Sequence, residues 1–203
     1  MRRPLVGAVL AVVLVLCGCA REPVAEAPPS APPASPQAPS SPAPQPPSPP
    51  PLPTPAAEPV ALTIPAIGVE AEIVPVGLKA DGSMETPDFG LAGWYTEGPR
   101  PGDPGPAVVV AHVDSRSGPD VFYRLRELQA GDQITVQQAD GRTAGFVVES
   151  SQQTDKDQLP TDRIWNQTTD PVLRLITCGG AFNNDTRHYE DNIIVYAQPA
   201  TTP

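Results

Sequence analysis

The feature that most constrains this chain is a proline-rich segment between Arg21 and Pro59. It holds 17 prolines in 39 residues, and Ala, Ser and Gln make up most of the remainder. Such a segment buries too little apolar surface to offset the entropy that ordering would cost. We therefore predict a disordered, semi-rigid polyproline linker over residues 20–59, which at about 3.1 Å per residue reaches on the order of 120 Å. Folding is then confined to residues 60–203, which suffice for one domain.

The start of the chain has the layout of an export signal. A short basic stretch precedes the apolar run Leu5–Leu16, which is shorter than the about 20 residues that a membrane-spanning helix needs. The segment Leu16-Cys17-Gly18-Cys19 resembles a bacterial lipobox, which implies cleavage before Cys19 and a lipid on that residue. We expect a signal peptide with lipobox over residues 1–19, and a protein tethered at the extracytoplasmic face of the bacterial cell membrane. An ordinary cleaved signal and an uncleaved anchor are the alternatives.

The charge of the domain argues against a nucleic-acid partner. Residues 60–203 contain 10 Lys and Arg against 20 Asp and Glu, so the whole net charge of −10 lies there. Proteins that bind nucleic acid usually present the opposite sign. Aromatic residues are only 5% of the chain, which argues against a platform for stacking bases or sugars.

Short apolar runs, separated by Gly, Pro and Asp, indicate an all-β domain. The predicted strands are Val60–Ile64, Ala71–Val76, Ala107–Val113, Gln133–Gln138, Thr143–Ser150, Val172–Cys178 and Asn192–Ala197. Only two short helices are predicted, at Val121–Leu128 and at about residues 161–165. Because strands and helices do not alternate, the pattern favours an antiparallel barrel or sandwich over a doubly wound sheet.

Cys178 is the most informative residue of the domain. The other two cysteines, Cys17 and Cys19, belong to the export segment, so Cys178 is left without a partner. An unpaired thiol is unusual in an exported protein, although a buried cysteine acting as a small hydrophobe is the common alternative. Gly179 and Gly180 end the strand directly after it, and backbone without side chains lets a substrate approach closely. We predict that Cys178 is a nucleophile.

A nucleophilic cysteine needs a base or a cationic partner. The chain has only two histidines, and His112 follows the buried strand pattern Ala107–Ala111, so it also lies at a strand end. We predict His112 as the catalytic partner and His188 as a neighbouring surface residue.

Arg187 is predicted to stabilise the charge that develops on the attacked carbonyl oxygen. It lies nine residues after Cys178, and pairing of the last two strands would return it beside the thiol. Arg174 is the rival, because period-two alternation places it on the same strand face as Cys178.

No cofactor is expected. Acidic residues near predicted loops offer oxygen ligands for calcium, but a solvated acidic surface is the preferred interpretation; they are Asp155, Asp157, Asp185, Glu190 and Asp191. We predict no metal site.

Three segments carry a resemblance to a known family: Ala111-His112-Val113, Leu175-Ile176-Thr177-Cys178-Gly179-Gly180 and Arg187-His188-Tyr189-Glu190-Asp191-Asn192. In this order, over about residues 60–200, they resemble the sortases, and most closely the actinobacterial class E/F branch. Sortase cysteines usually follow a Thr-Leu-x-Thr pattern, and Arg174 replaces its first Thr here. The resemblance implies a closed eight-stranded β-barrel with one or two short helices, and with His112, Cys178 and Arg187 gathered at one mouth.

The resemblance also implies a reaction. Cys178 attacks the Thr carbonyl of a Leu-Pro-x-Thr-Gly-like sorting signal, His112 protonates the leaving amine, and Arg187 holds the substrate backbone and the oxyanion. The thioester then passes to an amine or to water. The implied partners are secreted proteins with such C-terminal signals and an amine acceptor such as a cell-wall precursor, and Thr177 is a candidate substrate-binding residue.

Two other functions stay open from the sequence. An L,D-transpeptidase also uses Cys, His and Arg, but its nucleophile follows a Ser/Thr-His-Gly pattern where this chain has Leu-Ile-Thr. A non-catalytic surface lipoprotein with a sortase-like barrel, acting as a binding module, is the alternative from a different class. Whether residues 77–106 cover the substrate groove or border it is also open.

Overall fold

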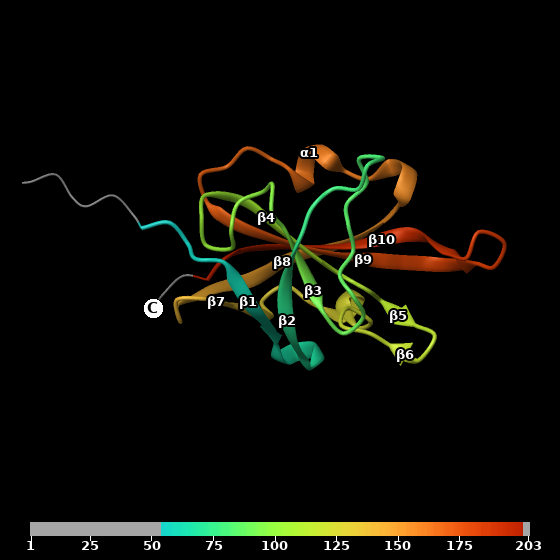
Figure 1. Ribbon diagram of the computed structural model, residues 1–203, viewed down its shortest axis with the longest axis horizontal. Coiled ribbons are helices and arrows are strands. Elements are labelled where there is room, and N and C mark those ends of the chain that lie inside the picture. The colour runs from blue at the N-terminus through green and yellow to red at the C-terminus, as the bar shows by residue number, and fades with distance from the viewer. Residues whose placement is uncertain (1–53, 201–203) are drawn as a thin grey trace, which may run out of the picture. The chain divides into compact units, whose positions relative to one another are not determined.

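A computed structural model describes residues 54–200 of the chain (Figure 1). The predicted signal peptide, Cys19 and the linker up to residue 53 lie outside the described residues. The described strands are β1 (Pro59–Ile64), β2 (Val69–Val76), β3 (Ala92–Tyr95), β4 (Gly105–Ala111), β5 (Asp114–Ser115), β6 (Gly118–Pro119), β7 (Gln133–Gln138), β8 (Thr143–Asp155), β9 (Pro171–Asn183) and β10 (His188–Pro199). The described helices are short: the 3-10 turns η1 (Pro65–Ile67), η2 (Leu125–Glu127) and η3 (Lys156–Gln158), and the helix α1 (Thr161–Ile164).

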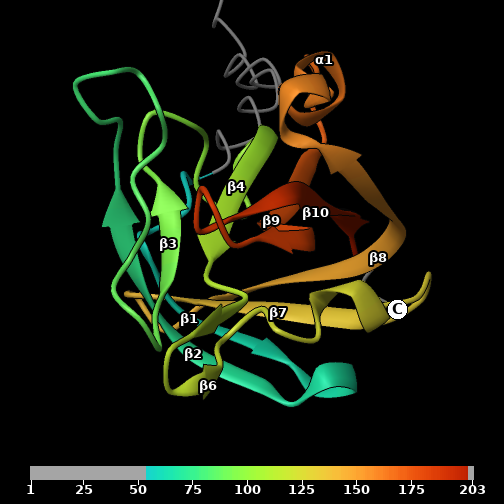
Figure 2. The same ribbon diagram turned by 90° about the vertical axis from the view of Figure 1, so that its right-hand side faces the viewer.

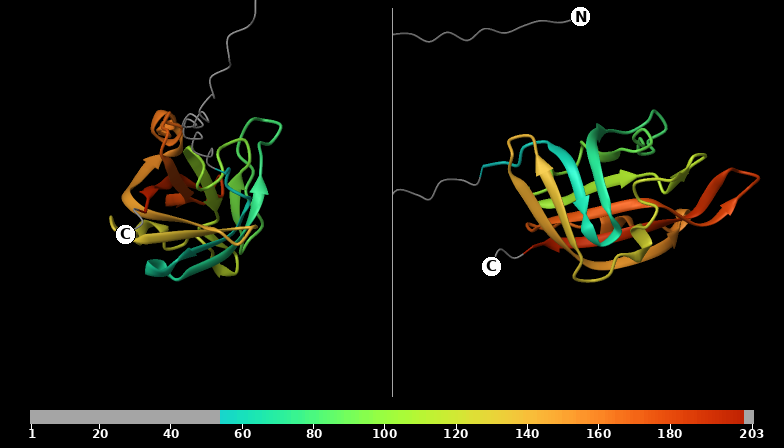
Figure 3. Two further views of the ribbon diagram at one scale, coloured as in Figure 1. Left: turned by 90° about the vertical axis from the view of Figure 1, so that its left-hand side faces the viewer. Right: turned by 90° about the horizontal axis from the view of Figure 1, so that it is seen from below.

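Eight of these strands close a barrel. Their order around it is β1-β2-β3-β4-β9-β10-β8-β7, and β7 pairs with β1 to complete the circuit (Figure 2). Most neighbours are antiparallel, whereas β2–β3 and β4–β9 are parallel pairs. The small strands β5 and β6 pair with each other outside the barrel (Figure 3). The prediction of an all-β fold with a closed eight-stranded barrel is confirmed.

All seven predicted strands are present, but β3 and the two-residue strands β5 and β6 were missed, and one predicted helix is wrong. The segment Val121–Leu128 is a turn followed by the 3-10 turn η2. Phe122, Leu125 and Leu128 are all buried, and a spacing of three aligns them on one face of a 3-10 turn. The same spacing is typical of an α-helix, which explains the wrong prediction.

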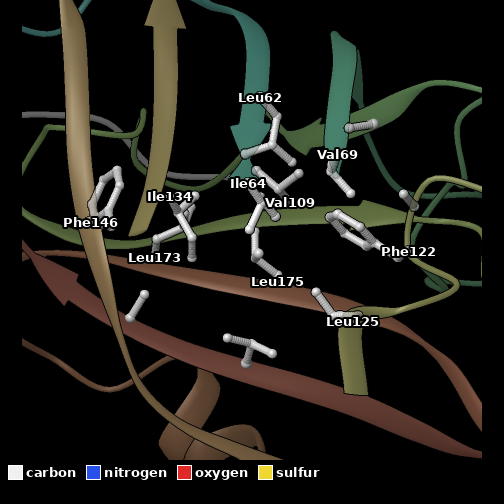
Figure 4. Close-up of a cluster of buried hydrophobic side chains, with 14 of the residues drawn as sticks. Leu62, Ile64, Val69, Val109, Phe122, Leu125, Ile134, Phe146, Leu173 and Leu175 are labelled. Carbon is white, nitrogen blue, oxygen red and sulfur yellow. The ribbon is translucent and has the colours of Figure 1, made fainter. Parts of the chain in front are cut away.

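The barrel interior holds the main hydrophobic core (Figure 4). Its side chains come from alternate positions of the strands, as the period of two requires. On β9, Leu173 and Leu175 point inward, and on the neighbouring β4 Val109 does the same. Phe122 and Leu125, which are fully buried, add to this core from the η2 segment.

The outer face of β4, β9 and β10 is also packed. The alternate residues Val108 and Val110 of β4, with Ile194 and Tyr196 of β10, form a second cluster with Ile164 of α1. The connection between β8 and β9 therefore covers part of this face. The next outward positions are those of Cys178, within β9, and His112, just after β4, which places these two predicted catalytic residues on the outer wall of the barrel.

Ordered contacts begin before the predicted domain boundary at residue 60. Ala56 is buried and its N–H donates to Asp103 Oδ1 over 2.6 Å. Arg142 Nη2 donates to the Pro55 carbonyl over 2.9 Å. Among the described residues, no helix is long and apolar enough to cross a membrane.

Candidate active site

Cys178 and His112 are brought together by the parallel pairing of β4 and β9. Val110 is paired with Ile176 in the register of these strands. Two residues further along each chain come His112, just after the end of β4, and Cys178 on β9, and both line the same cleft. The structure thus brings together two of the three predicted catalytic residues. They lie on the outer wall of the barrel and not inside its mouth.

Both residues line a cleft of about 650 Å³. One side is formed by the segment between β2 and β4, which includes Met84 and Tyr95, and the other by Leu159, Ile164 and Trp165 around α1. Residues 77–106 were expected either to cover the groove or to border it. Part of this segment borders the cleft and forms one of its walls. Most lining side chains are apolar, and no Arg or Lys is among the described residues that line the cleft.

The imidazole of His112 is held by the segment between β2 and β3. Its Nε2 lies 2.9 Å from the Pro87 carbonyl oxygen, and its ring centroid lies 4.5 Å from that of Phe89. A carbonyl oxygen can only accept, so Nε2 is the donor in this contact and Nδ1 is left as the acceptor nitrogen. The Asp120 carboxylate fixes this segment, because its Oδ1 accepts from the Gly90 N–H over 2.9 Å.

The residues that follow His112 are tied to β10. The Tyr189 hydroxyl donates a short hydrogen bond to the Asp114 carboxylate. This bond, together with burial, raises the pKa of Tyr189 to about 12. The Tyr189 ring also packs edge-on against Phe182, with centroids 5.1 Å apart.

Thr177 links the two strand segments at the site, and its role in substrate binding stays a prediction. Its side chain is buried, and its hydroxyl donates to the Ala111 carbonyl over 2.7 Å. This bond links the residue before Cys178 to the residue before His112. Thr177 therefore joins β9 to the end of β4, and its hydroxyl hydrogen is engaged in this bond.

Gly179 and Gly180 have a steric role beside the thiol. A Cβ on Gly179 would lie 2.7 Å from the Ile193 side chain. Gly180 has φ +77°, and a Cβ there would collide with the Asp191 side chain. Glycine is required at both positions by the close approach of β10.

The prediction that Arg187 lies beside Cys178 is wrong. β9 continues past the cysteine to Asn183, so the chain turns at residues 184–187, where Arg187 is exposed with φ 59°. The Arg187 N–H donates to the Asn183 carbonyl over 2.8 Å to close this turn. At about 3.3 Å per residue, Arg187 lies on the order of 15 Å along the strand from the position opposite Cys178. Figure 1 shows the β9–β10 hairpin projecting from the barrel.

Asn192 occupies the place that Arg187 was predicted to fill. It is the β10 residue directly paired with Cys178, and it lines the same cleft. The sequence analysis placed Asn192 at the start of a predicted strand but gave it no role, because Arg187 was assigned to the oxyanion. The signal that identifies it is the alternation along β10, where residues 192, 194 and 196 share the outward face.

Arg174 and His188 lie away from the thiol. Arg174 is only 5% exposed, and it donates from Nη1 to the Leu173 carbonyl and from Nη2 to Asn166 Oδ1. Its guanidinium lies 4.9 Å from the Tyr196 ring centroid, and burial lowers its pKa. His188 is exposed beside the hairpin turn. Arg174 is thus a packing residue behind the cleft.

The acidic residues considered for calcium form a crowded surface. Asp155 faces Asp191 across the β8–β10 pair, and the hydrogen bond and negative charge of Asp191 raise the pKa of Asp155. Within residues 54–200, no group of three or more His, Cys, Asp or Glu side chains is arranged to hold a metal ion.

Comparison with known proteins agrees with this arrangement. A family model described as the sortase domain matches residues 62–200. Similar solved structures include sortase C1 from Streptococcus suis, with 15% identity, a TM-score of 0.56, and coverage of 72% of this chain and 75% of that one. Sortase C-1 from Actinomyces oris has 19% identity, a TM-score of 0.55 and coverage of 70% and 73%. A lid mutant of sortase A from Corynebacterium diphtheriae has 16% identity, a TM-score of 0.57 and coverage of 74% of each chain.

At these identities the solved structures establish likeness of fold. A comparison with curated protein sequences finds no match. The family model spans more than half of the chain and includes the cleft with Cys178 and His112. The chain belongs to the sortase family.

Proposed function

We propose that this protein is an exported sortase-type cysteine transpeptidase. The observation that carries the proposal is that Cys178 on β9 and His112, directly after the neighbouring β4, line one apolar cleft of a sortase-family barrel. The proposed substrates are secreted proteins that carry a Leu-Pro-x-Thr-Gly-like sorting signal. The proposed acceptor is an amine such as that of a cell-wall precursor, with water as the competing acceptor.

In the first step the Cys178 thiolate attacks the Thr carbonyl carbon of the signal. A C–S bond forms, the Thr–Gly C–N bond breaks, and the leaving amine takes a proton from His112. In the second step the acceptor amine attacks the thioester, gives its proton to His112 and releases the Cys178 thiolate. Atoms and protons balance over the two steps, and His112 returns to its starting state.

The cleft suits the apolar part of such a signal. Tyr95 and Trp165 contact each other edge-to-face with centroids 5.3 Å apart, and Ile176 lies directly before the Thr177–Cys178 pair. Leu and Pro side chains bind well to walls of this kind, because they leave water and meet aromatic and branched surfaces.

Anchoring at the membrane is part of the proposal and rests on the sequence alone. The lipobox-like segment supports lipidation of Cys19, and the proline-rich linker supports a tether between the membrane and the barrel. The proposed location is the extracytoplasmic face of the cell membrane. The class E/F subtype rests on the same kind of evidence and stays a prediction.

The test is cleavage of a panel of Leu-Pro-x-Thr-Gly-type peptides by the purified chain, with and without an added amine. We expect a covalent thioester intermediate and an amine-linked product, detected by mass spectrometry. Cys178→Ala abolishes both, and His112→Ala lowers the rate by about 10²–10⁴-fold. A panel in which no peptide reacts in a Cys178-dependent way contradicts the proposal.

One observation favours the binding-module alternative. The described residues that line the cleft include no Arg or Lys, although an arginine was expected to stabilise the oxyanion. A binding module would retain a sorting-signal peptide equally well in the wild type and in Cys178→Ala, without forming a covalent adduct. Peptide binding measured by fluorescence anisotropy for both proteins distinguishes the two functions.

A further inference from the structure

Asn192 is the polar side chain that the strand register places directly beside the nucleophile. It is paired with Cys178 across β9 and β10. Directly opposed residues of an antiparallel pair have Cβ atoms about 4.5–5.5 Å apart and point to the same face. Cys178 and Asn192 are both half-buried and both line the cleft.

The Asn192 amide is available to a ligand. Within the part of the chain that the structure describes, its side chain makes no hydrogen bond, whereas the neighbouring Asp191 carboxylate accepts from Gln153 Nε2. An asparagine side chain has two N–H donors and one carbonyl acceptor. A half-buried amide that faces a cleft and has no partner there can donate to a bound carbonyl group.

Acyl transfer requires a hydrogen-bond donor close to the attacked carbonyl oxygen. When a thiolate attacks a carbonyl carbon, the carbonyl oxygen gains negative charge and needs hydrogen-bond donors nearby. Arg187 is in the hairpin turn and Arg174 is bound to Leu173 and Asn166 behind the cleft. His112, on the opposite side of Cys178, is assigned to proton transfer. Asn192 is thus the donor that flanks Cys178 on the side away from His112.

We propose that the Asn192 amide donates a hydrogen bond to the carbonyl oxygen that Cys178 attacks, in place of the predicted Arg187. The inference rests on the proposed acyl-transfer function and names the group that stabilises its oxyanion. A neutral donor stabilises the oxyanion without adding positive charge beside the thiol.

The test compares two reactions of the Cys178 thiol in the full chain. Acylation by p-nitrophenyl acetate passes through an oxyanion, whereas reaction with a methanethiosulfonate forms a disulfide and involves no carbonyl. We expect Asn192→Ala to slow acylation by about 10- to 100-fold, with disulfide formation within about twofold of the wild type. Asn192→Asp is expected to be slower still in acylation, because its carboxylate repels the oxyanion.

Matched variants identify the residue responsible. Arg187→Ala and Asn184→Ala, both in the exposed hairpin turn, are expected to acylate at the wild-type rate. Unchanged acylation in Asn192→Ala overturns the inference, as does an equal fall in both reactions, because either result shows that Asn192 does not act on the oxyanion. If acylation slows in Arg187→Ala and not in Asn192→Ala, Arg187 is the oxyanion donor and the inference is wrong.

The ester assay also separates this inference from the proposed function. A small ester reports the oxyanion donor whether or not the chain cleaves any sorting-signal peptide. If peptides react, Asn192→Ala is expected to lower kcat by about 10²-fold and to change KM by less than threefold, as for loss of a single oxyanion donor.

Discussion

At the scale of single residues, the site is built around Cys178. Asn192 is directly paired with it across β9 and β10, and His112 follows the end of the neighbouring strand β4. Cys178 and His112 could be predicted because each is rare in this chain and each follows a buried strand pattern. Arg187 was predicted wrongly, because the sequence did not show how far β9 continues beyond Gly180. That register depends on a β-bulge near Tyr189, which leaves no periodic signal.

Gly180 provides a residue-scale prediction. We expect Gly180→Ala to lower the free energy of unfolding by about 2 kcal/mol or more, because a left-handed φ costs an L-residue about 1–2 kcal/mol and the Asp191 side chain must also move. Gly141→Ala is the matched control, since Gly141 has φ +85° with no atom near its Cβ position. Urea unfolding of both variants measures the difference. Equal losses would show that the contact with Asp191 has no energetic effect.

At the scale of elements, most strands were predictable and their pairing was not. The runs that became β4, β7 and β9 are apolar or alternating, and their period is visible in the sequence. β3 was missed because its four residues, Ala92–Tyr95, are too few to show a period. The parallel β4–β9 contact joins segments that are far apart in the sequence, so no local pattern indicates it. It is this contact that places His112 beside Cys178.

The β8–β10 pair provides an element-scale prediction. Asp155 and Asp191 are directly opposed, and the pKa of Asp155 is raised by the Asp191 hydrogen bond and charge. A raised carboxyl pKa in the folded state means that this pair adds stability when Asp155 is protonated. That stability is lost as the pH rises above the ordinary Asp value of about 3.9 and through the folded pKa.

We therefore expect Asp155→Asn to raise Tm at pH 7 and to leave it unchanged near pH 3. Asp162→Asn in α1 removes the same charge without an opposed carboxylate, and it is expected to change Tm little at either pH. Thermal unfolding followed by circular dichroism at the two pH values measures this. An increase in Tm for Asp155→Asn that is the same at both pH values would contradict the assignment of repulsion between Asp155 and Asp191.

At the scale of the whole molecule, barrel closure could not be derived from strand patterns. The pattern allowed a barrel or a sandwich, and only the resemblance to the sortases implied closure, which the pairing of β1 with β7 confirms. The inner and outer cores of the barrel explain why the pattern was ambiguous. β4 is apolar at nearly every position because both of its faces are covered, so alternation does not indicate which face is inside.

Membrane attachment provides a prediction for the full chain. We expect the protein to incorporate labelled palmitate when it is made in a bacterial host, and Cys19→Ala to lose the label and leave the membrane fraction. Cys17→Ala, which keeps Cys19, is expected to retain both the palmitate label and the association with the membrane fraction. Label that persists in Cys19→Ala would show that the lipobox-like segment is not used.

The outward position of Cys178 has a consequence for engineering this protein. Neighbouring positions of β9 alternate between the inner core and the outer wall, so Leu173 and Leu175 maintain the barrel whereas Ile176 and Cys178 face the cleft. A library that randomises the cleft-facing residues leaves the inward-facing core residues unchanged, so most of its members are expected to fold. Selection for new peptide preferences then samples recognition separately from stability.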